Sequence, residues 1–109
     1  MNVYDTANKL ASEIKASNEY LEYKRLKEFI NSSAVLKEKV KAFEEARYEA
    51  QIEVMQGKQN TEKLGEVQKM YTELLQNQDI KKYFDAELKF NVMLTDVNRI
   101  IGESVKDVM

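Results

Sequence analysis

The chain contains no cysteine, histidine, proline or tryptophan, and it has only three glycines among its 109 residues. Without cysteine there are no disulfide bonds, thiolate zinc sites or cysteine-bound iron–sulfur clusters within this chain. Without histidine, the most common general base and the His-Glu-x-x-His type of zinc site are excluded as well. An enzyme built from this sequence would have to work with carboxylates and lysines.

The scarcity of proline and glycine also decides the fold class. Proline interrupts a helix, and glycine in a helix interior costs about 1 kcal/mol relative to alanine. Gly57, Gly65 and Gly102 are too far apart for a glycine-rich phosphate-binding loop. The residues that fill the chain instead, mainly Glu, Lys, Ala, Leu and Gln, are good helix formers. The composition therefore predicts an all-α protein.

Length and charge are typical of one globular domain, which we place at residues 1–109. Hydrophobic residues make up 43%, charged residues make up 33%, and the net charge is -2. This balance gives no overall attraction to nucleic acid or to anionic lipid. No apolar run reaches the roughly 18 residues that a membrane span needs, and no signal peptide is recognisable. We therefore expect a cytoplasmic protein with no membrane partner.

Apolar residues recur at steps of three and four along five segments, which predicts five helices. The apolar series run over residues 3–14, 20–30, 36–54, 64–75 and 80–101. Between them, Ser17 is predicted to cap the second helix, the Ser32-Ser33 pair the third, and Asp79 the fifth. Gly57 is predicted as a left-handed C-terminal cap at the start of a turn over residues 57–60. After Gly102 we expect the chain to fray or bend.

The short turn after the third helix predicts how the helices pack. Two helices joined by about four residues must lie antiparallel, and the fifth can return along them as the third member of an antiparallel bundle. The two shorter N-terminal helices would pack across this bundle. Phe43, Tyr71, Phe84 and Leu94 are its expected core residues.

The carboxylates provide weak candidates for chemistry. Glu45 and Glu49 lie four residues apart and could share a hard cation, but a solvated helix face is the favoured interpretation. Glu87 lies on the apolar stripe of the fifth helix, where a charge must be paired, at an edge, or at an interface. An edge position or an ion pair is favoured over a functional contact. We assign no catalytic, cofactor-binding or metal-binding residue, and we expect no cofactor.

Two lysine-rich stretches, at residues 24–27 and 37–41, raise the possibility of nucleic-acid binding. Residues two apart on a helix point to different sides, and acidic residues are interspersed among these lysines. A solvated face is favoured again, so we expect no direct contact with nucleic acid. Tyrosines suit either the edge of a core or a protein interface.

The fifth helix is the predicted partner-facing element. Five amphipathic helices carry more apolar surface than one small bundle easily covers, so we expect a homo-oligomer, most simply a dimer. The predicted interface residues are dense and extend beyond a single narrow face: Tyr83, Phe84, Glu87, Phe90, Met93 and Leu94. The competing interpretation is that the first two helices cover all of this surface.

Sequence features across nearly the whole chain resemble the YheA/YmcA-like family, which includes the YlbF group of competence and sporulation regulators. The resemblance rests on packing patterns in three stretches: Val3 to Ala7 with Leu10-Ala11 and Ile14-Lys15; Ser17 with Glu19-Tyr20; and Asn77 to Tyr83 followed by Ala86-Glu87, Phe90, Leu94, Val97-Asn98 and Ile100-Ile101. The chain lacks the cysteines and the longer C-terminal extension of those regulators. It looks closer to the short YheA branch, whose role is unassigned.

The resemblance implies a small bacterial cytoplasmic helical protein with a three-helix bundle at its C-terminal end. Some relatives act without catalysis, as subunits of a complex that influences the sporulation phosphorelay, competence, biofilm formation and RNA processing through RNase Y. We therefore expect a non-enzymatic protein–protein interaction module, in the role of a regulatory adaptor. The alternatives are a carboxylate-based metal-binding or enzymatic protein and a weak RNA-binding module.

Overall fold

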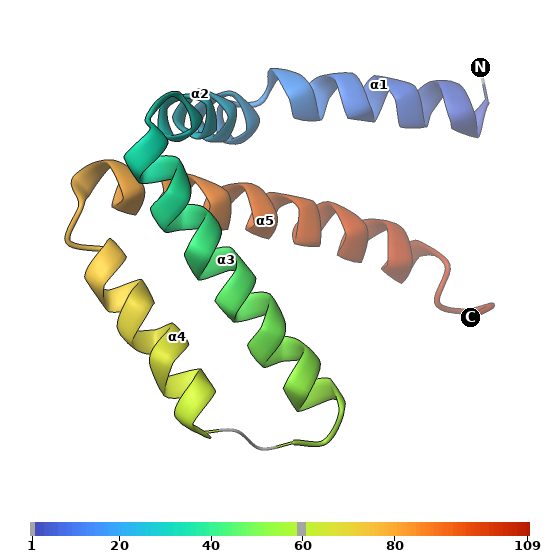
Figure 1. Cartoon of the computed structure of the whole chain (residues 1–109). Helices are drawn as coiled ribbons and strands as arrows, with labels where there is room; N and C mark the ends of the chain where they lie inside the picture. The colour runs from blue at the N-terminus through green and yellow to red at the C-terminus, as the bar shows by residue number, and fades with distance from the viewer. Residues whose placement is uncertain (1, 59–60) are drawn as a thin grey trace. The chain divides into compact units, whose positions relative to one another are not determined.

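A computed structural model describes residues 2–58 and 61–109, and these residues form five α-helices (Figure 1). The helices are α1 (Val3–Ala16), α2 (Asn18–Ser32), α3 (Ala34–Met55), α4 (Thr61–Leu74) and α5 (Gln78–Ser104). No strand occurs in the described part of the chain. The predicted all-α class with five helices is confirmed.

The chain divides into two compact units, which we describe separately. One unit comprises residues 1–27 and 83–109, and the other comprises residues 28–82. The first boundary falls inside α2 and the second inside α5, so both units contain parts of the same two helices.

Serine side chains cap the N-termini of α2 and α3. The Ser17 hydroxyl oxygen accepts a hydrogen bond from the backbone N–H of Tyr20 at 3.2 Å, and Ser33 does the same for Leu36 at 3.2 Å. Each serine satisfies an amide that has no partner inside its helix. The predicted caps at Ser17 and at the Ser32-Ser33 pair are thus confirmed, with Ser33 in the capping position.

Two further details of the chain turns were predicted with mixed success. Gly57 has φ of +80°, the left-handed conformation expected after the end of α3. The rest of the predicted turn at Gln59 and Asn60 lies outside the described residues. After α4, the cap of α5 is Asn77 and not Asp79: its Oδ1 accepts hydrogen bonds from the amides of Asp79 and Ile80 at 2.9 and 3.1 Å.

The error at Asp79 has a simple local cause. Asparagine and aspartate are almost equally good caps, so composition does not choose between two such residues that lie two positions apart. With Asn77 as the cap, Asp79 falls in the first turn of α5, where its negative charge complements the helix dipole.

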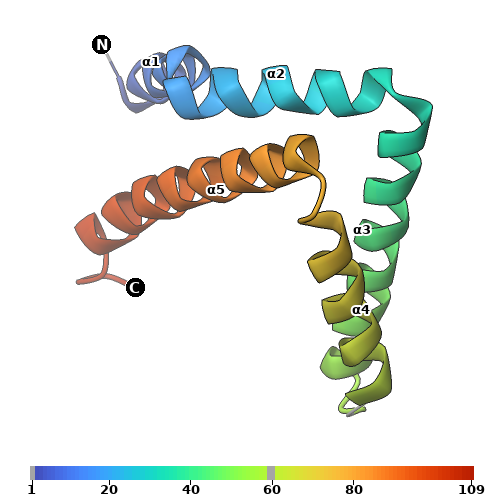
Figure 2. The same cartoon turned by 90° about the vertical axis from the view of Figure 1, so that its left-hand side faces the viewer.

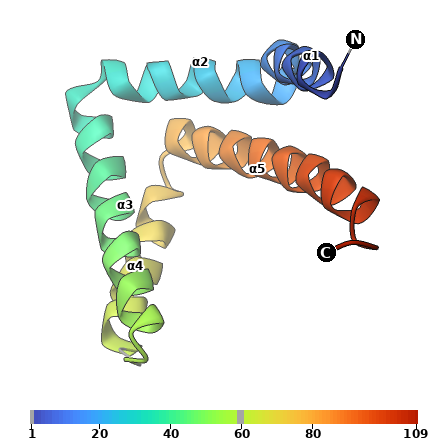
Figure 3. The same ribbon diagram turned by 90° about the vertical axis from the view of Figure 1, so that its right-hand side faces the viewer.

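In the unit of residues 28–82, α3 and α4 pack side by side and run in opposite directions (Figures 1 and 3). This confirms the antiparallel pairing predicted from the short connection. Phe43 is only 3% exposed, and its ring lies 5.8 Å from the ring of Tyr71. Val40 and Ala50 are also buried on α3. Tyr71, which we expected in the core, lies at its edge with 36% of its surface exposed.

In the other unit, α1 buries none of its residues. Burial is concentrated where the first part of α2 runs beside α5, and it includes Leu26, Tyr83, Phe84 and Ala86 (Figure 2). Leu94, expected in the core, is half-buried. Helix α5 continues through Gly102 and ends at Ser104, after which the chain forms turns. No helix in the described ranges has the length and apolar content that crossing a membrane requires.

Candidate protein–protein interface

The six residues predicted as an interface occupy different depths on α5. Tyr83 and Phe84 are buried, with 3% and 7% of their surfaces exposed. The other four, Glu87, Phe90, Met93 and Leu94, are half-buried. The buried pair leaves little surface for a partner, while the half-buried residues retain some.

An aromatic cluster between α2 and α5 explains this burial. The ring of Phe90 lies 6.0 Å from that of Tyr20 and 5.4 Å from that of Tyr23, and Tyr23 lies 5.7 Å from Tyr83. All three pairs are tilted, an arrangement in which aromatic rings attract each other beyond their area of burial. This face of α5 is therefore engaged within the chain.

Glu87, the unexpected charge on the apolar stripe, has a partner inside the same cluster. The hydroxyl of Tyr23 donates a hydrogen bond to Oε2 of Glu87 at 3.2 Å, in a partly buried setting. Of the possibilities left open by the sequence, pairing accounts for this residue. The bond joins residues on α2 and α5 and helps to set the register of these helices.

A second apolar surface of α5 is exposed, and the sequence analysis missed it. Leu88 is 64% exposed and Val92 is 50% exposed. They lie four residues apart, hence on one face of the helix. The four-residue spacing of Leu88 and Val92 could have predicted this surface, but the interface was assigned to the more strongly apolar stripe around Phe90.

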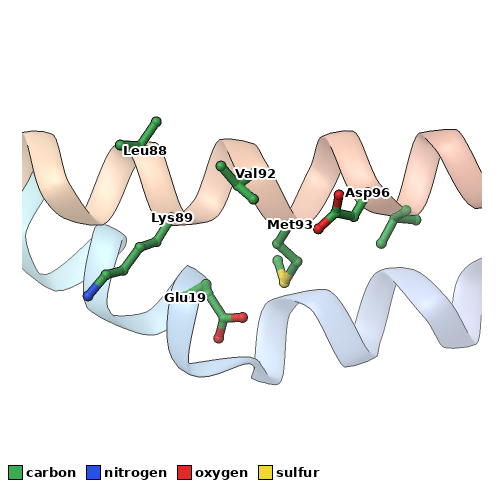
Figure 4. A pocket seen from close by; sticks show the side chains of 7 residues that line it. Glu19, Leu88, Lys89, Val92, Met93 and Asp96 are labelled. Atoms are coloured by element: carbon green, nitrogen blue, oxygen red, sulfur yellow. The ribbon is translucent and has the colours of Figure 1, made fainter.

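This surface borders an open groove of about 560 Å³ (Figure 4). Its lining residues come from α5, with one from the start of α2: Glu19, Leu88, Lys89, Val92, Met93, Asp96 and Val97. Figure 4 shows Glu19 across the groove from the α5 side chains. Met93 is the predicted interface residue that also lines this groove.

A second apolar groove lies between α1 and the C-terminal part of α5. Val3, Ala7 and Leu10 of α1 line it together with Ile101 of α5. Ile100 and Ile101 are more than half exposed. The apolar stripe of α1 therefore remains accessible along this groove.

Two carboxylates of the α3–α4 unit are paired with one lysine. Nζ of Lys63 lies 3.1 Å from an oxygen of Glu49 and 3.6 Å from one of Glu53. The hydrogen bond to Glu49 raises the pKa of Lys63 above its usual value. Among the residues that the structure describes, no three acidic residues gather in a group that could hold a metal ion. Glu49, a candidate for cation binding, is thus occupied by an internal ion pair.

Two of the three basic residues in the stretch on α2 also have partners within the chain. Nη2 of Arg25 lies 2.6 Å from Oε1 of Glu22, and this bond raises the pKa of Arg25. Nζ of Lys27 lies 5.8 Å from the centre of the Tyr23 ring, as in a cation–π contact.

Sequence comparison decides which family this arrangement represents. Residues 3–106 match the family model described as "Control of competence regulator ComK, YlbF/YmcA". The chain belongs to the YlbF/YmcA family. The resemblance inferred from the packing patterns is thereby confirmed.

Alignments with known relatives cover almost the full length of both proteins. A UPF0342 protein from Symbiobacterium thermophilum is 36% identical over 104 residues, which span 94% of this chain and 93% of the relative. A UPF0342 protein from Alkalihalophilus pseudofirmus is 32% identical over 108 residues, which span 98% and 92% of the two chains.

Two solved structures share the fold of this YlbF/YmcA family member. A protein of unknown function (DUF964) from Bacillus stearothermophilus superposes with a TM-score of 0.85 at 16% identity, covering 97% of this chain and 94% of its own. YheA from Bacillus subtilis superposes with a TM-score of 0.73 at 20% identity over the whole of both chains. These likenesses support the five-helix architecture.

Proposed function

We propose that the chain is a non-enzymatic protein–protein interaction module that forms a homodimer and acts as a regulatory adaptor in a bacterial cytoplasmic complex. The observation that carries this proposal is the exposed apolar surface of α5 around Leu88 and Val92, beside a groove lined mainly by apolar side chains. Contiguous apolar surface of this kind is typical of sites that bind another protein.

The proposed interface revises the set of residues expected from the sequence. Leu88, Val92 and Met93 supply the contact surface, because they line the open groove. Tyr83 and Phe90 support α5 from its inner side through their contacts with Tyr23. A partner would thus bind a helix whose opposite face is already packed.

The family supports the regulatory part of the proposal. The matching family model is named for control of the competence regulator ComK. Relatives such as the UPF0342 protein of S. thermophilum align over most of their length. A regulatory role common to these relatives would therefore use the surface of the aligned helices.

The competing classes find less support in the side-chain contacts. A metal-binding or enzymatic role would rest on carboxylates, and Glu49 and Glu53 are paired with Lys63. An RNA-binding role would rest on basic residues, and Arg25 is paired with Glu22. We also propose that residues 1–109 act as one domain, since α2 and α5 each run through both compact units.

Light scattering at micromolar concentrations tests the dimer. The wild-type chain should have twice the mass of one chain, and Val92→Ser should shift the equilibrium toward monomer without loss of helical circular dichroism. Val35→Ser is the matched control, because Val35 is an exposed valine on α3. A wild-type mass that stays at one chain as concentration rises would refute self-association.

A tagged pull-down from the native cell tests the adaptor role. Proteins that the wild-type chain retains after nuclease treatment, and that Val92→Ser fails to retain, would support a protein-binding module. Partners that disappear on nuclease treatment would instead favour the RNA-binding class. Measurable turnover that is lost on carboxylate substitution would favour the enzymatic class.

A further inference from the structure

The exposed face of α5 carries one pair of opposite charges at equal distances from its midpoint. Asp85, Leu88, Val92, Asp96 and Arg99 follow one another at steps of three, four, four and three residues. Such steps place all five on one face of a helix. All five are exposed, so this face is available to a partner.

The spacing is symmetric about Val92, and the two outermost residues carry opposite charges. Asp85 lies seven residues before Val92, and Arg99 lies seven residues after it. Leu88 and Asp96 each lie four residues from Val92, on opposite sides of it. Asp85 therefore has a counterpart of the opposite sign at the same distance on the other side.

This pattern is what an antiparallel pair of identical helices requires. In a twofold contact, residue i of one copy meets residue j of the other, and j meets i. With the axis at Val92, each Asp85 faces the second copy's Arg99. A parallel, in-register pair would instead place Asp85 against Asp85 and Lys89 against Lys89, and like charges disfavour that arrangement.

The apolar centre and the adjoining groove fit the same arrangement. Val92 would meet its own copy at the axis, and Leu88 would lie opposite Asp96, at the groove that Met93 also lines. The incoming Lys89 would approach a groove edge that carries Asp96 and, across the opening, Glu19. Burying two leucines and two valines at the centre supplies apolar contact, while the flanking charges set the direction.

Existing ion pairs on this face are weak enough to be exchanged. Arg99 lies 3.8 Å from Asp96 and 3.6 Å from Glu103, and all three side chains are more than half exposed. Exposed pairs at such distances contribute little to stability. Within the described ranges, neither Asp85 nor Lys89 forms an ion pair.

We infer that the occupant of this surface is a second copy of the chain, bound through α5 in an antiparallel twofold contact centred on Val92. The inference rests on the proposed self-association and adds its face, direction and register. It is tested by an experiment that can fail while the dimer itself stands.

The absence of cysteine from the chain makes disulfide trapping specific. A disulfide needs Cα atoms within about 7 Å. Two copies of residue 92 meet at the axis, whereas two copies of residue 88 would be about 12 Å apart along antiparallel helices, from the rise of about 1.5 Å per residue. Val92→Cys alone should therefore form a covalent dimer under mild oxidation. Leu88→Cys and Asp96→Cys should form one only when the two variants are mixed.

Tyr48→Cys, at an exposed position on α3, measures cross-linking by random collision. Light scattering of each reduced variant first establishes its mass. Efficient cross-linking of Leu88→Cys with itself would overturn the antiparallel direction. A dimeric mass with no cross-link above the Tyr48→Cys background would overturn the proposed face but leave the dimer intact. A monomeric wild-type chain would overturn both proposals.

Charge reversal provides a second, independent test of the register. Asp85→Lys or Arg99→Asp alone places like charges opposite each other twice per dimer, and each should raise the dissociation constant roughly tenfold. The double variant restores opposite charges and should return to within about threefold of wild type. Glu38→Lys, an exposed reversal on α3, controls for net charge. A double variant weaker than both single variants would contradict the Asp85–Arg99 pairing.

Discussion

Helices α1 and α3 both carry apolar residues at helical spacing, but the structure covers only one of these faces. Helix α3 buries Val40, Phe43 and Ala50, because the short connection to α4 brings a second apolar face against it. Helix α1 buries no residue, and part of its stripe lies along an open groove. An amphipathic pattern thus predicts which face needs a partner and leaves the partner's identity open.

The difference implies unequal local stability. Regions with few buried apolar contacts open at low free energy, whereas well-packed regions open only with the whole domain. The α3–α4 hairpin should therefore resist opening, and α1 should open readily unless another surface covers it.

The largest expected effect comes from Phe43→Ala. Phe43 is buried and contacts Tyr71, so the substitution removes apolar burial and leaves a cavity that should lower the free energy of unfolding by about 3 to 5 kcal/mol. Urea denaturation followed by circular dichroism measures the change. Tyr48→Ala, on an exposed position of the same helix, should change stability far less. Equal losses in the two variants would show that α3 has no specific core.

Hydrogen exchange compares the two helices directly. Amides in the middle of α1 should exchange about a hundredfold faster than amides near Phe43, corresponding to about 3 kcal/mol in opening free energy. Mass spectrometry on peptides from both helices measures this ratio. If α1 is as strongly protected as α3 at concentrations where the chain is monomeric, the proposed contrast is wrong.

Two glycines of the α3–α4 hairpin provide a test with a smaller expected effect on stability. Gly57 has a positive φ, which strains any side-chain-bearing residue, so Gly57→Ala should destabilise the hairpin by about 1 kcal/mol. Gly65 lies inside α4 with open space where a Cβ would point, so Gly65→Ala should stabilise by about 0.5 to 1 kcal/mol. Thermal unfolding should shift in opposite directions. Shifts of the same sign would contradict the assigned role of Gly57.

The smallest effect concerns the ion pairs of Lys63. Its pKa is raised, first by the hydrogen bond to Glu49, so the pairing favours the folded state below the usual lysine pKa and is lost as pH rises through the folded value. Glu49→Gln should lower the pKa of Lys63, as measured by NMR of the lysine side chain. Glu45→Gln, one turn away on α3, is the control. An unchanged Lys63 titration in Glu49→Gln would remove Glu49 as the cause.

The candidate interface was only partly predictable. The sequence indicated α5 as the partner-facing helix and included Met93, which lines the exposed groove. It also assigned Tyr83 and Phe84 to the interface, although both are buried in the structure. Periodicity detects apolar positions on a helix but does not separate those that face a neighbouring helix from those that face solvent. Leu88 and Val92 were therefore missed for the same reason that Tyr83 was included.

The sequence by itself determined the helices and most of their ends, because these depend on neighbouring residues. Helical spacing, the caps at Ser17 and Ser33, and the left-handed Gly57 involve contacts within a few positions of the chain. Only the tertiary structure decided which apolar faces are covered. The pairing of Glu87 with Tyr23 joins residues 64 positions apart, and neither residue's local sequence specifies the other. Burial is a property of the packed surfaces, so it emerges only when distant helices meet.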